Sequence, residues 1–500
     1  MSVLADLLQR GQAVPAHRPW PRAIVDAAAW NATVAALAHA QLDLAGLWAE
    51  TGTVHMALRE PETSAMAVLS LACPLGRYPS VGARHAPAIR LERTIFDLWG
   101  LEADGAADRR PWLDHGRWGL RHPSGARVDS PAPEPYAFLT AEGESLHQIA
   151  VGPVHAGIIE PGHFRFTANG ETVVRLEERL GYLHRGLESL MAGTAPLAAA
   201  RLAGRASGDS TVAYAIAFAR AVEAALETPA PPRAHWLRAV MAELERLANH
   251  LGDIGAICND ASFSLMQAHC AVLREQVLRA SAAAFGHRLM MDRVVPGGVA
   301  ADLEPAGAQA IVDAVRLVSD RLPVLVDLYD DTASLQDRTV GTGVVTAEMA
   351  NRFAAGGYVG RASGRTFDAR RQAAYAPYDT LSFETPSRSE GDVDARVWIR
   401  IEEVRQSLSL LDQLITGLPQ GTIGAFLPEG SGEGMALVEG FRGDILAWVR
   451  LDQGLVARCC LRDPSWFQWP LLEACIEGNI VADFPLCNKS FNCSYAGCDL

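Results

Sequence analysis

The spacing of apolar residues changes along the chain, from every second position near the N-terminus to every third or fourth position later. Alternation over residues 53–58 and 66–71 predicts half-buried strands. In residues 86–99 the apolar positions recur at helical spacing among charged ones, and Gly100 follows them, which predicts an amphipathic helix. Strands followed by one helix indicate a small α+β domain.

The segments that flank this domain have a different composition. The first forty residues are rich in alanine, proline and arginine, and we expect them to be peripheral, with a short helix over 27–38. Residues 121–135 contain four prolines and a glycine, so they predict an extended connection. We therefore expect a peripheral segment at 1–40, a domain at 41–122, a linker at 123–145 and a second domain at 146–500.

The second domain is dominated by helical periodicity. Residues 147–174 predict a pair of strands, and 436–452 returns to strand-like alternation. Helical patterns run over 196–226, 235–258, 273–290, 306–328 and 397–418. The predicted fold class is α+β: a small N-terminal α/β-sandwich-like domain, then a large helical-bundle domain with peripheral β-hairpins.

Composition excludes several classes of function. The formal net charge of −14 argues against nucleic acid as a partner. No run of eighteen apolar residues and no secretory signal pattern occurs, so we expect the chain to remain in the cytoplasm. The nine cysteines include no CxxC pair, which makes a disulfide framework or a zinc site unexpected. No glycine-rich dinucleotide fingerprint supports direct NAD binding.

Two short segments resemble the metal-binding motifs of nickel–iron hydrogenase large subunits. Residues 205–210, Arg-Ala-Ser-Gly-Asp-Ser, have the frame of R-x-C-G-x-C, with Ser207 and Ser210 in the thiol positions. Residues 491–496, Phe-Asn-Cys-Ser-Tyr-Ala, have the place of D-P-C-x-x-C, where Cys493 remains and Ala496 replaces the second cysteine.

The resemblance covers most of the chain. It is to the large subunit of group 4 membrane-bound hydrogenases of the formate hydrogenlyase type, and more distantly to the quinone-site subunit of complex I. Residues 78–85, 92–100 and 112–116 are similar to the small complex I subunit that this hydrogenase type carries as a fused N-terminal domain.

The resemblance implies a nickel–iron centre held by four thiolates, and this chain lacks most of them. A serine hydroxyl stays protonated near neutral pH and is a hard donor, so it does not replace a thiolate. We therefore predict that nickel and iron are absent and that Ser207, Ser210, Cys493 and Ala496 are vestigial ligand positions. A small shift could recruit Cys498, five residues after Cys493, but two ligands would still be missing.

Residues 152–163 resemble the active-site hairpin of the family, in which a glutamate relays protons. Glu160 has that place, and its apolar neighbours Ile158 and Ile159 predict that the carboxyl group is buried. A hairpin carboxylate that caps a turn is the alternative.

Arg185 and Glu188 resemble the R-G-x-E motif, whose two side chains on one helix face brace the cysteine-bearing loop; an exposed pair is the alternative. Arg442 has the place of the arginine that lies over the metal centre, and otherwise would be a buried hydrogen-bond fork beside a carboxylate. Residues 243–250 match the E-x-x-R-x-x-x-H helix, where a structural ion network and a functional one are equally expected.

The chain also departs from complex I. Ile159 stands where the complex I hairpin has a second histidine, and Gly208 stands where it has the quinone-binding tyrosine. A quinone headgroup would need other partners, and His155, His163 and Tyr214 are the candidates.

Three hypotheses follow. The first is a hydrogenase-like large subunit of a membrane-associated oxidoreductase, which docks an iron–sulfur small subunit and a membrane arm and transfers electrons to an acceptor such as quinone. The second is a scaffold or coupling subunit without redox chemistry. The third is an active nickel–iron hydrogenase, which the serines oppose. The first places the chain on the inner face of the cytoplasmic membrane, held there by its partners.

Overall fold

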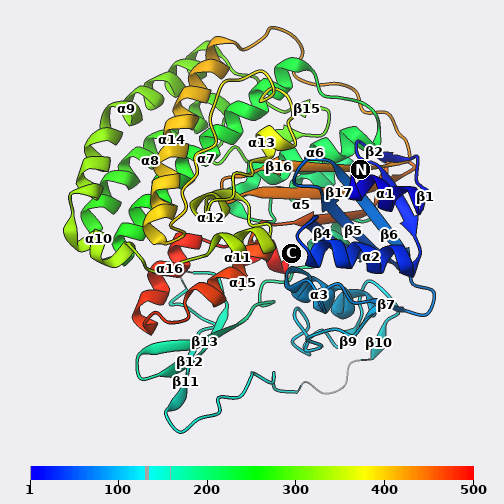
Figure 1. The fold of residues 1–500 in the computed structure, drawn as a ribbon. Coiled ribbons are helices and arrows are strands. Elements are labelled where there is room, and N and C mark those ends of the chain that lie inside the picture. The colour runs from blue at the N-terminus through cyan, green and yellow to red at the C-terminus, as the bar shows by residue number, and fades with distance from the viewer. Residues whose placement is uncertain (1, 130–133, 158) are drawn as a thin grey trace.

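A five-stranded sheet organises the N-terminal part of the computed structural model, which describes residues 2–129, 134–157 and 159–500 (Figure 1). Pro131 and Pro133 of the expected linker and Ile158 of the hairpin lie outside the described residues. The strands, in sheet order, are β1 (Gln12–Ala13), β3 (Arg22–Val25), β6 (Met66–Ala72), β5 (Thr53–Arg59) and β4 (Asp43–Glu50). All neighbours are antiparallel except β3 and β6.

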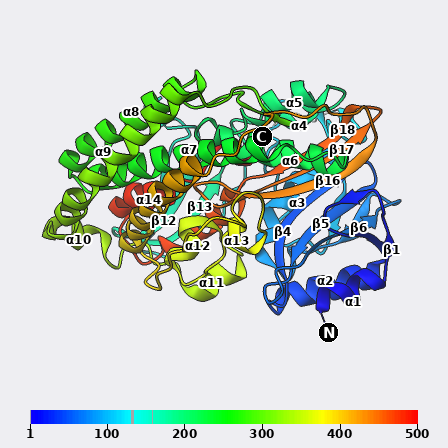
Figure 2. The ribbon, with the colours of Figure 1, turned by 90° about the horizontal axis from the view of Figure 1, so that it is seen from above.

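This sheet is covered on both faces. Helices α1 (Val3–Gln9) and α2 (Ala27–Ala38) lie on one face, and a second sheet lies on the other, with helix α6 (Thr211–Ala225) beyond it (Figure 2). Trp48 of the first sheet packs against Trp448 of the second, with ring centroids 5.6 Å apart. The strands predicted to be half-buried are therefore almost wholly buried.

The second sheet joins the two ends of the chain. Its order is β18 (Leu455–Arg462), β17 (Asp444–Asp452), β16 (Gly432–Glu439) and β2 (His17–Arg18), and β2 runs parallel to β16. Residues 2–40 thus supply strands to both sheets rather than lying at the periphery. The predicted helix at 27–38 is confirmed as α2; the domain boundaries stay predictions.

Long helices form the rest of the second domain, as predicted (Figure 1). The bundle consists of α7 (Pro232–Asp260), α8 (Ser264–Phe285), α9 (Pro305–Asp330) and α14 (Val393–Thr416). Local sequence sets their ends: the Asp392 side chain caps α14 by accepting from the Ala395 amide, and α8 stops at Gly286, whose φ is 74°. No helix within the described ranges is both long and apolar enough to cross a membrane.

The helix predicted at 196–226 is interrupted. It forms α5 (Pro196–Ala203), the 3-10 turn η2 (Gly208–Ser210) and α6, so the segment that resembles R-x-C-G-x-C is the break between two helices. The predicted strand pair at 147–174 is three-stranded, with β11 (Leu146–Val151), β12 (His163–Asn169) and β13 (Thr172–Arg179). The hairpin 152–162 joins the first two.

The remaining elements are short and connect the larger ones. The C-terminal region has α15 (Ser465–Cys475), η3 (Val481–Asp483), α16 (Phe484–Phe491) and α17 (Ala496–Asp499). Around the first domain lie β7 (Arg77–Pro79), η1 (Ala86–Ala88), α3 (Ile89–Trp99), β8 (Glu102–Asp104), β9 (Leu120–Arg121) and β10 (Val128–Asp129). The others are α4 (Leu187–Met191), β14 (Val294–Val295), β15 (Gly298–Val299), α10 (Ala333–Thr339), α11 (Ala347–Arg352), α12 (Gly357–Ala362) and α13 (Ala369–Gln372).

The contact between the two sheets should contribute strongly to stability. Trp448 has no exposed surface, so Trp448→Ala should lower the free energy of unfolding by about 3–5 kcal/mol in urea denaturation. Phe426 is 88% exposed, and Phe426→Ala should change the free energy of unfolding by less than about 0.5 kcal/mol. Equal effects of the two substitutions would contradict the packing described.

Candidate functional site

The break between α5 and α6 and the loop between α16 and α17 meet in space. The Ser207 hydroxyl lies 2.9 Å from the hydroxyl of Ser494, a residue of the tail segment. Ser207 and Ser210 are buried, and each donates a hydrogen bond to Asp209, at 2.8 and 3.2 Å. The structure therefore brings together the two segments that would hold the metals in the hydrogenase family.

An ion pair crosses this meeting point. Arg442, at the turn between β16 and β17, donates to both carboxylate oxygens of Asp209 and, at 3.1 Å, to Ser210. Its Nε donates to the carbonyl of Asn492. Arg442 thus has the hydrogen-bond fork geometry considered from the sequence, and Asp209, inside the motif itself, is the carboxylate that pairs with it.

The pair fixes the charge of Asp209. Burial raises the pKa of this carboxyl group, but the charge and hydrogen bonds of Arg442 and the two serine hydroxyls lower it from 3.8 to about 2. Because 34% of the Asp209 side chain remains exposed, solvent screens part of this interaction.

The hairpin 152–162 also contacts the tail segment of this site. Glu160 accepts a hydrogen bond from the amide of Ala496 at 3.2 Å. The prediction that Glu160 is buried is wrong: Glu160 is exposed, as is its neighbour Ile159, because no segment within the described ranges buries the two side chains. Ile158, on which that expectation also rested, lies outside the described residues.

The side chains present do not fit a nickel–iron centre. Of the four positions predicted to be vestigial, two hold hydroxyls engaged with Asp209, one holds the methyl group of Ala496, and the Cys493 thiol lies 3.9 Å from the Gln468 side-chain oxygen. Among the described residues, no group of three or more histidine, cysteine, aspartate or glutamate side chains is arranged to hold a metal ion. Cys498 lines a separate cavity between the two domains.

Arg185 and Glu188 do not share a helix face. Gly186, with φ of 65°, caps α4 between them, so Arg185 precedes the helix and Glu188 lies in its first turn. Arg185 donates to the carbonyls of Arg205 and Ala206, both at 3.0 Å, and so braces the vestigial loop. Glu188 instead holds β18, through Arg458 at 2.7 Å and the Leu461 amide at 2.9 Å.

The candidate quinone contacts are engaged within the chain. Tyr214 is fully buried and donates to Asp463 at 2.6 Å. A ring nitrogen of His155 lies 2.8 Å from the Gly162 carbonyl, and one of His163 lies 3.3 Å from the Gly152 carbonyl. The two histidines therefore form hydrogen bonds within the hairpin, and the Tyr214 hydroxyl is not available to a ligand.

A network of buried ionisable side chains lies beside the ion pair. Its members are at most 2% exposed and come from four helical segments and one strand. They are Glu243, Arg246 and His250 of α7, Arg361 of α12, Asp368 and Arg370 at α13, Glu403 of α14 and Glu439 of β16. The predicted stripe on α7 is therefore part of an ion network.

Charge balance makes this network sensitive to protons. Four carboxylates face three arginines, so one negative charge remains unless a proton is held. Burial and the nearby Asp368 raise the pKa of Glu439 to about 7. Glu403 differs: burial opposes its ionisation, but the charge of Arg361 and a 2.7 Å hydrogen bond with His250 lower its pKa well below the usual value.

Sequence reasoning did not find Asp209, Asp463, Ser494 or Gln468 as members of this region. Asp209 could have been found, because it lies between the two serines of the motif that pointed to the site. Ser494 could have been found in the same way, because it follows Cys493 in the tail motif. Asp463 and Gln468 follow from tertiary packing: the Gln468 side chain, for example, donates to the Arg442 carbonyl at 2.9 Å.

The chain is similar to proteins of known families. A family model described as respiratory-chain NADH dehydrogenase, 49 kDa subunit, matches residues 260–429. Formate hydrogenlyase subunit 5 of Escherichia coli (strain K12) is 30% identical over 439 residues, which are 84% of this chain and 77% of that protein. The carbon monoxide-induced hydrogenase of Rhodospirillum rubrum is 30% identical over 352 residues, 70% and 98% of the two chains.

One solved structure extends the likeness to the fold. It is that of the membrane-bound sulfane sulfur reductase, an archaeal respiratory membrane complex. A chain of that complex is 26% identical and superposes with a TM-score of 0.68, over 72% of this chain and 100% of its own length.

Removing the carboxylate of Asp209 should change the acid dependence of stability. Its pKa is lower in the folded state, so its contribution is present above about 3.8 and is lost as pH falls toward 2. Asp209→Asn should cost about 1–2 kcal/mol at pH 6, given the partial exposure, and less at pH 3. Urea denaturation at the two pH values measures this; a cost that is larger at pH 3 would contradict the ion pair.

Two glutamates of the buried network should respond in opposite ways. Glu403→Gln should lower the free energy of unfolding by about 3–5 kcal/mol, because it breaks the buried pair with Arg361.

Glu439 has a raised pKa, so its stabilising contribution is present below about pH 4.5 and is lost as pH rises through about 7. Glu439→Gln should therefore gain stability relative to the native protein between pH 5 and pH 8 in urea denaturation. A difference that is constant with pH would contradict the charge count.

Proposed function

The chain belongs to the family of large subunits that group 4 membrane-bound hydrogenases share with the 49 kDa subunit of complex I, and from this membership we propose a redox role without nickel. In this proposal it is the large subunit of a membrane-associated, complex-I-type oxidoreductase. It receives electrons from an iron–sulfur small subunit and passes them to an acceptor such as quinone.

The observation that carries the proposal is the replacement of the metal ligands by an ion pair. Where the hydrogenase motifs have four cysteines, this chain has Ser207, Ser210, Cys493 and Ala496, and Arg442 is hydrogen-bonded to Asp209 between the two serines. A guanidinium and a carboxylate that satisfy each other do not recruit a soft metal pair.

The exposed hairpin supports a partner subunit at this site. Val154 and Ile159 at its tip are 74% and 49% exposed, and Glu160 is exposed beside them, next to the tail segment. Apolar side chains gathered at the mouth of a site are typical of a surface that another chain covers. We assign this face to the iron–sulfur subunit, and we assign attachment to the inner face of the cytoplasmic membrane to membrane-arm partners.

A scaffold role is the second candidate, and one observation favours it. Tyr214 is buried and gives its hydroxyl to Asp463, and His155 and His163 each use one ring nitrogen on a hairpin carbonyl, so the tyrosine hydroxyl is not available to a quinone headgroup. In that case the chain keeps the interfaces of the family and couples its partners without exchanging electrons.

Metal analysis of the purified complex tests the loss of nickel. We expect no stoichiometric nickel in the native protein, and none after Ser207→Cys with Ser210→Cys, because Ala496 still leaves the ligand set incomplete. An unchanged unfolding transition is the control that the double variant folds. Nickel near one atom per chain in the native complex would overturn both candidates.

The same complex separates the two candidates. Under the redox proposal it reduces a soluble quinone analogue, and Arg442→Gln lowers the rate at least ~10-fold, while Arg279→Gln, whose side chain is 70% exposed on α8, leaves it unchanged. Under the scaffold candidate no quinone is reduced by either form.

A further inference from the structure

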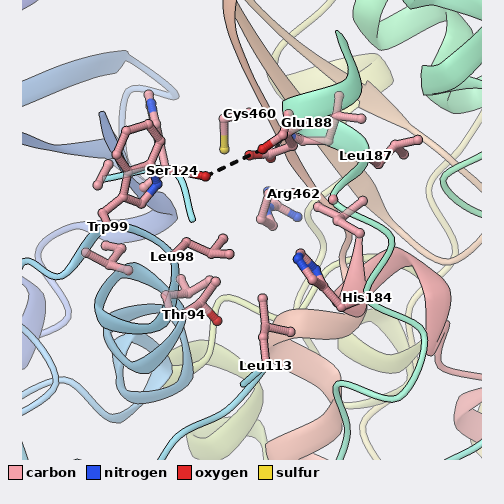
Figure 3. A pocket seen from close by; sticks show the side chains of 18 of the residues that line it. Thr94, Leu98, Trp99, Leu113, Ser124, His184, Leu187, Glu188, Cys460 and Arg462 are labelled. Carbon is pink, nitrogen blue, oxygen red and sulfur yellow. Dashed lines mark hydrogen bonds between the residues drawn. The ribbon is translucent and has the colours of Figure 1, made fainter. Parts of the chain in front are cut away.

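A cavity of about 310 Å³ lies between the first domain and the second sheet (Figure 3). Helix α3 forms one wall with Thr94, Leu98 and Trp99. The opposite wall comes from the segment at α4 and from β18, with His184, Leu187 and Cys460 among its side chains. The cavity therefore exists only because the two domains pack together.

The inner part of the cavity is apolar. Leu91, Ile95, Leu113, Leu187 and Trp466 are buried side chains that line it. Protein interiors are normally packed without such voids, and a space of this size, roughly ten water volumes, would hold water only if polar groups served it.

The charged groups of the inner wall are already engaged. Arg462 donates to the Ala45 carbonyl at 2.7 Å and pairs with Asp444 at 2.5 Å. Arg458 pairs with Glu188 at 2.7 Å. What the inner cavity offers to a ligand is therefore hydrocarbon surface, which suits an apolar chain.

The outer part has the opposite character. Ser124, Arg127 and Ser189 are the polar side chains in the more exposed section of the lining. The two serine hydroxyls are 3.5 Å apart, a weak mutual contact. The Nε of Arg127 donates to the Pro123 carbonyl at 3.2 Å, and its guanidinium forms no ion pair with any carboxylate of the described residues. A cation and two hydroxyls thus surround the entrance of an apolar space.

We propose that this cavity binds a fatty acid, with its acyl chain between the two domains and its carboxylate at Arg127, Ser124 and Ser189. The volume accommodates a chain of about ten methylenes, if each takes about the ~30 Å³ of one water. The match is one of charge as well as of shape, because the apolar floor and a guanidinium that no carboxylate of the described residues neutralises together select an anionic single-chain amphiphile. The site is separate from the proposed redox function and does not depend on it.

A bound fatty acid would hold the domains together. It contacts α3 of the first domain and β18 of the second at once, and a ligand that binds only the folded, docked arrangement stabilises it. Saturating ligand should therefore raise the midpoint of thermal unfolding as well as bind.

Dodecanoate is the probe for the proposed binding site. It is titrated into the chain at concentrations below the micelle concentration of dodecanoate, and calorimetry measures the binding. We expect one saturable site. Leu98→Trp, which places a larger side chain in the cavity, should weaken binding at least ~10-fold, whereas Leu75→Trp, at a side chain 87% exposed elsewhere, should not.

Reversing the charge of Arg127 tests whether the entrance binds the carboxylate, without altering the packing of the cavity. Arg127→Glu should weaken dodecanoate at least ~5-fold and leave dodecanol within ~2-fold, while the matched Arg279→Glu changes neither. No saturable binding, binding that Leu98→Trp leaves intact, or equal loss of dodecanoate and dodecanol in Arg127→Glu would overturn the proposal. So would a cavity that accepts dodecanoate in the isolated chain but is filled by a partner's side chain in the assembled complex.

Discussion

The pairing of buried carboxylates with buried arginines is the constraint on which the rest of this molecule depends. Glu403 of α14 accepts from Arg361 of α12 and contacts His250 of α7, and Arg361 reaches Glu439 at the end of β16. Each of these charges would be very costly alone in an apolar interior, so the elements that carry them are held in one arrangement. Arg442 follows Glu439 by three residues, and its position is therefore set by the network.

The candidate site can be understood in the same terms. A metal site needs donors that are deprotonated and soft, whereas this site has hydroxyls, an amide side chain and an ion pair, which satisfy one another. The loop and the tail still meet, because Arg185 braces the loop and Asp499 accepts from the Gly181 and Leu183 amides. The loop and the tail that form this site are thus held together by polar contacts between protein groups.

The sequence was sufficient for elements whose pattern is local. The periodicity that predicted α7 and α14, and the Gly100 signal that ends α3, depend on residues close in the chain. The family motifs also brought Ser207, Ser210 and Arg442 to one place. What periodicity did not reveal depends on distant partners: the second sheet that buries β5, the Gly186 cap that separates Arg185 from Glu188, and the Asp463 that takes the Tyr214 hydroxyl. Sequence spacing carries no information on which face of an element another element will cover.

The parallel pairing of β2 with β16 has a consequence for biosynthesis. His17 lies opposite Glu433, so this contact joins residues more than four hundred positions apart. At a synthesis rate of about 5–20 residues per second, the early strand waits roughly 20–80 s on the ribosome before its neighbour is made. During that interval the backbone edge that β16 will occupy is open, and a nascent chain of this kind is a natural client for a holding chaperone until β16 has been made.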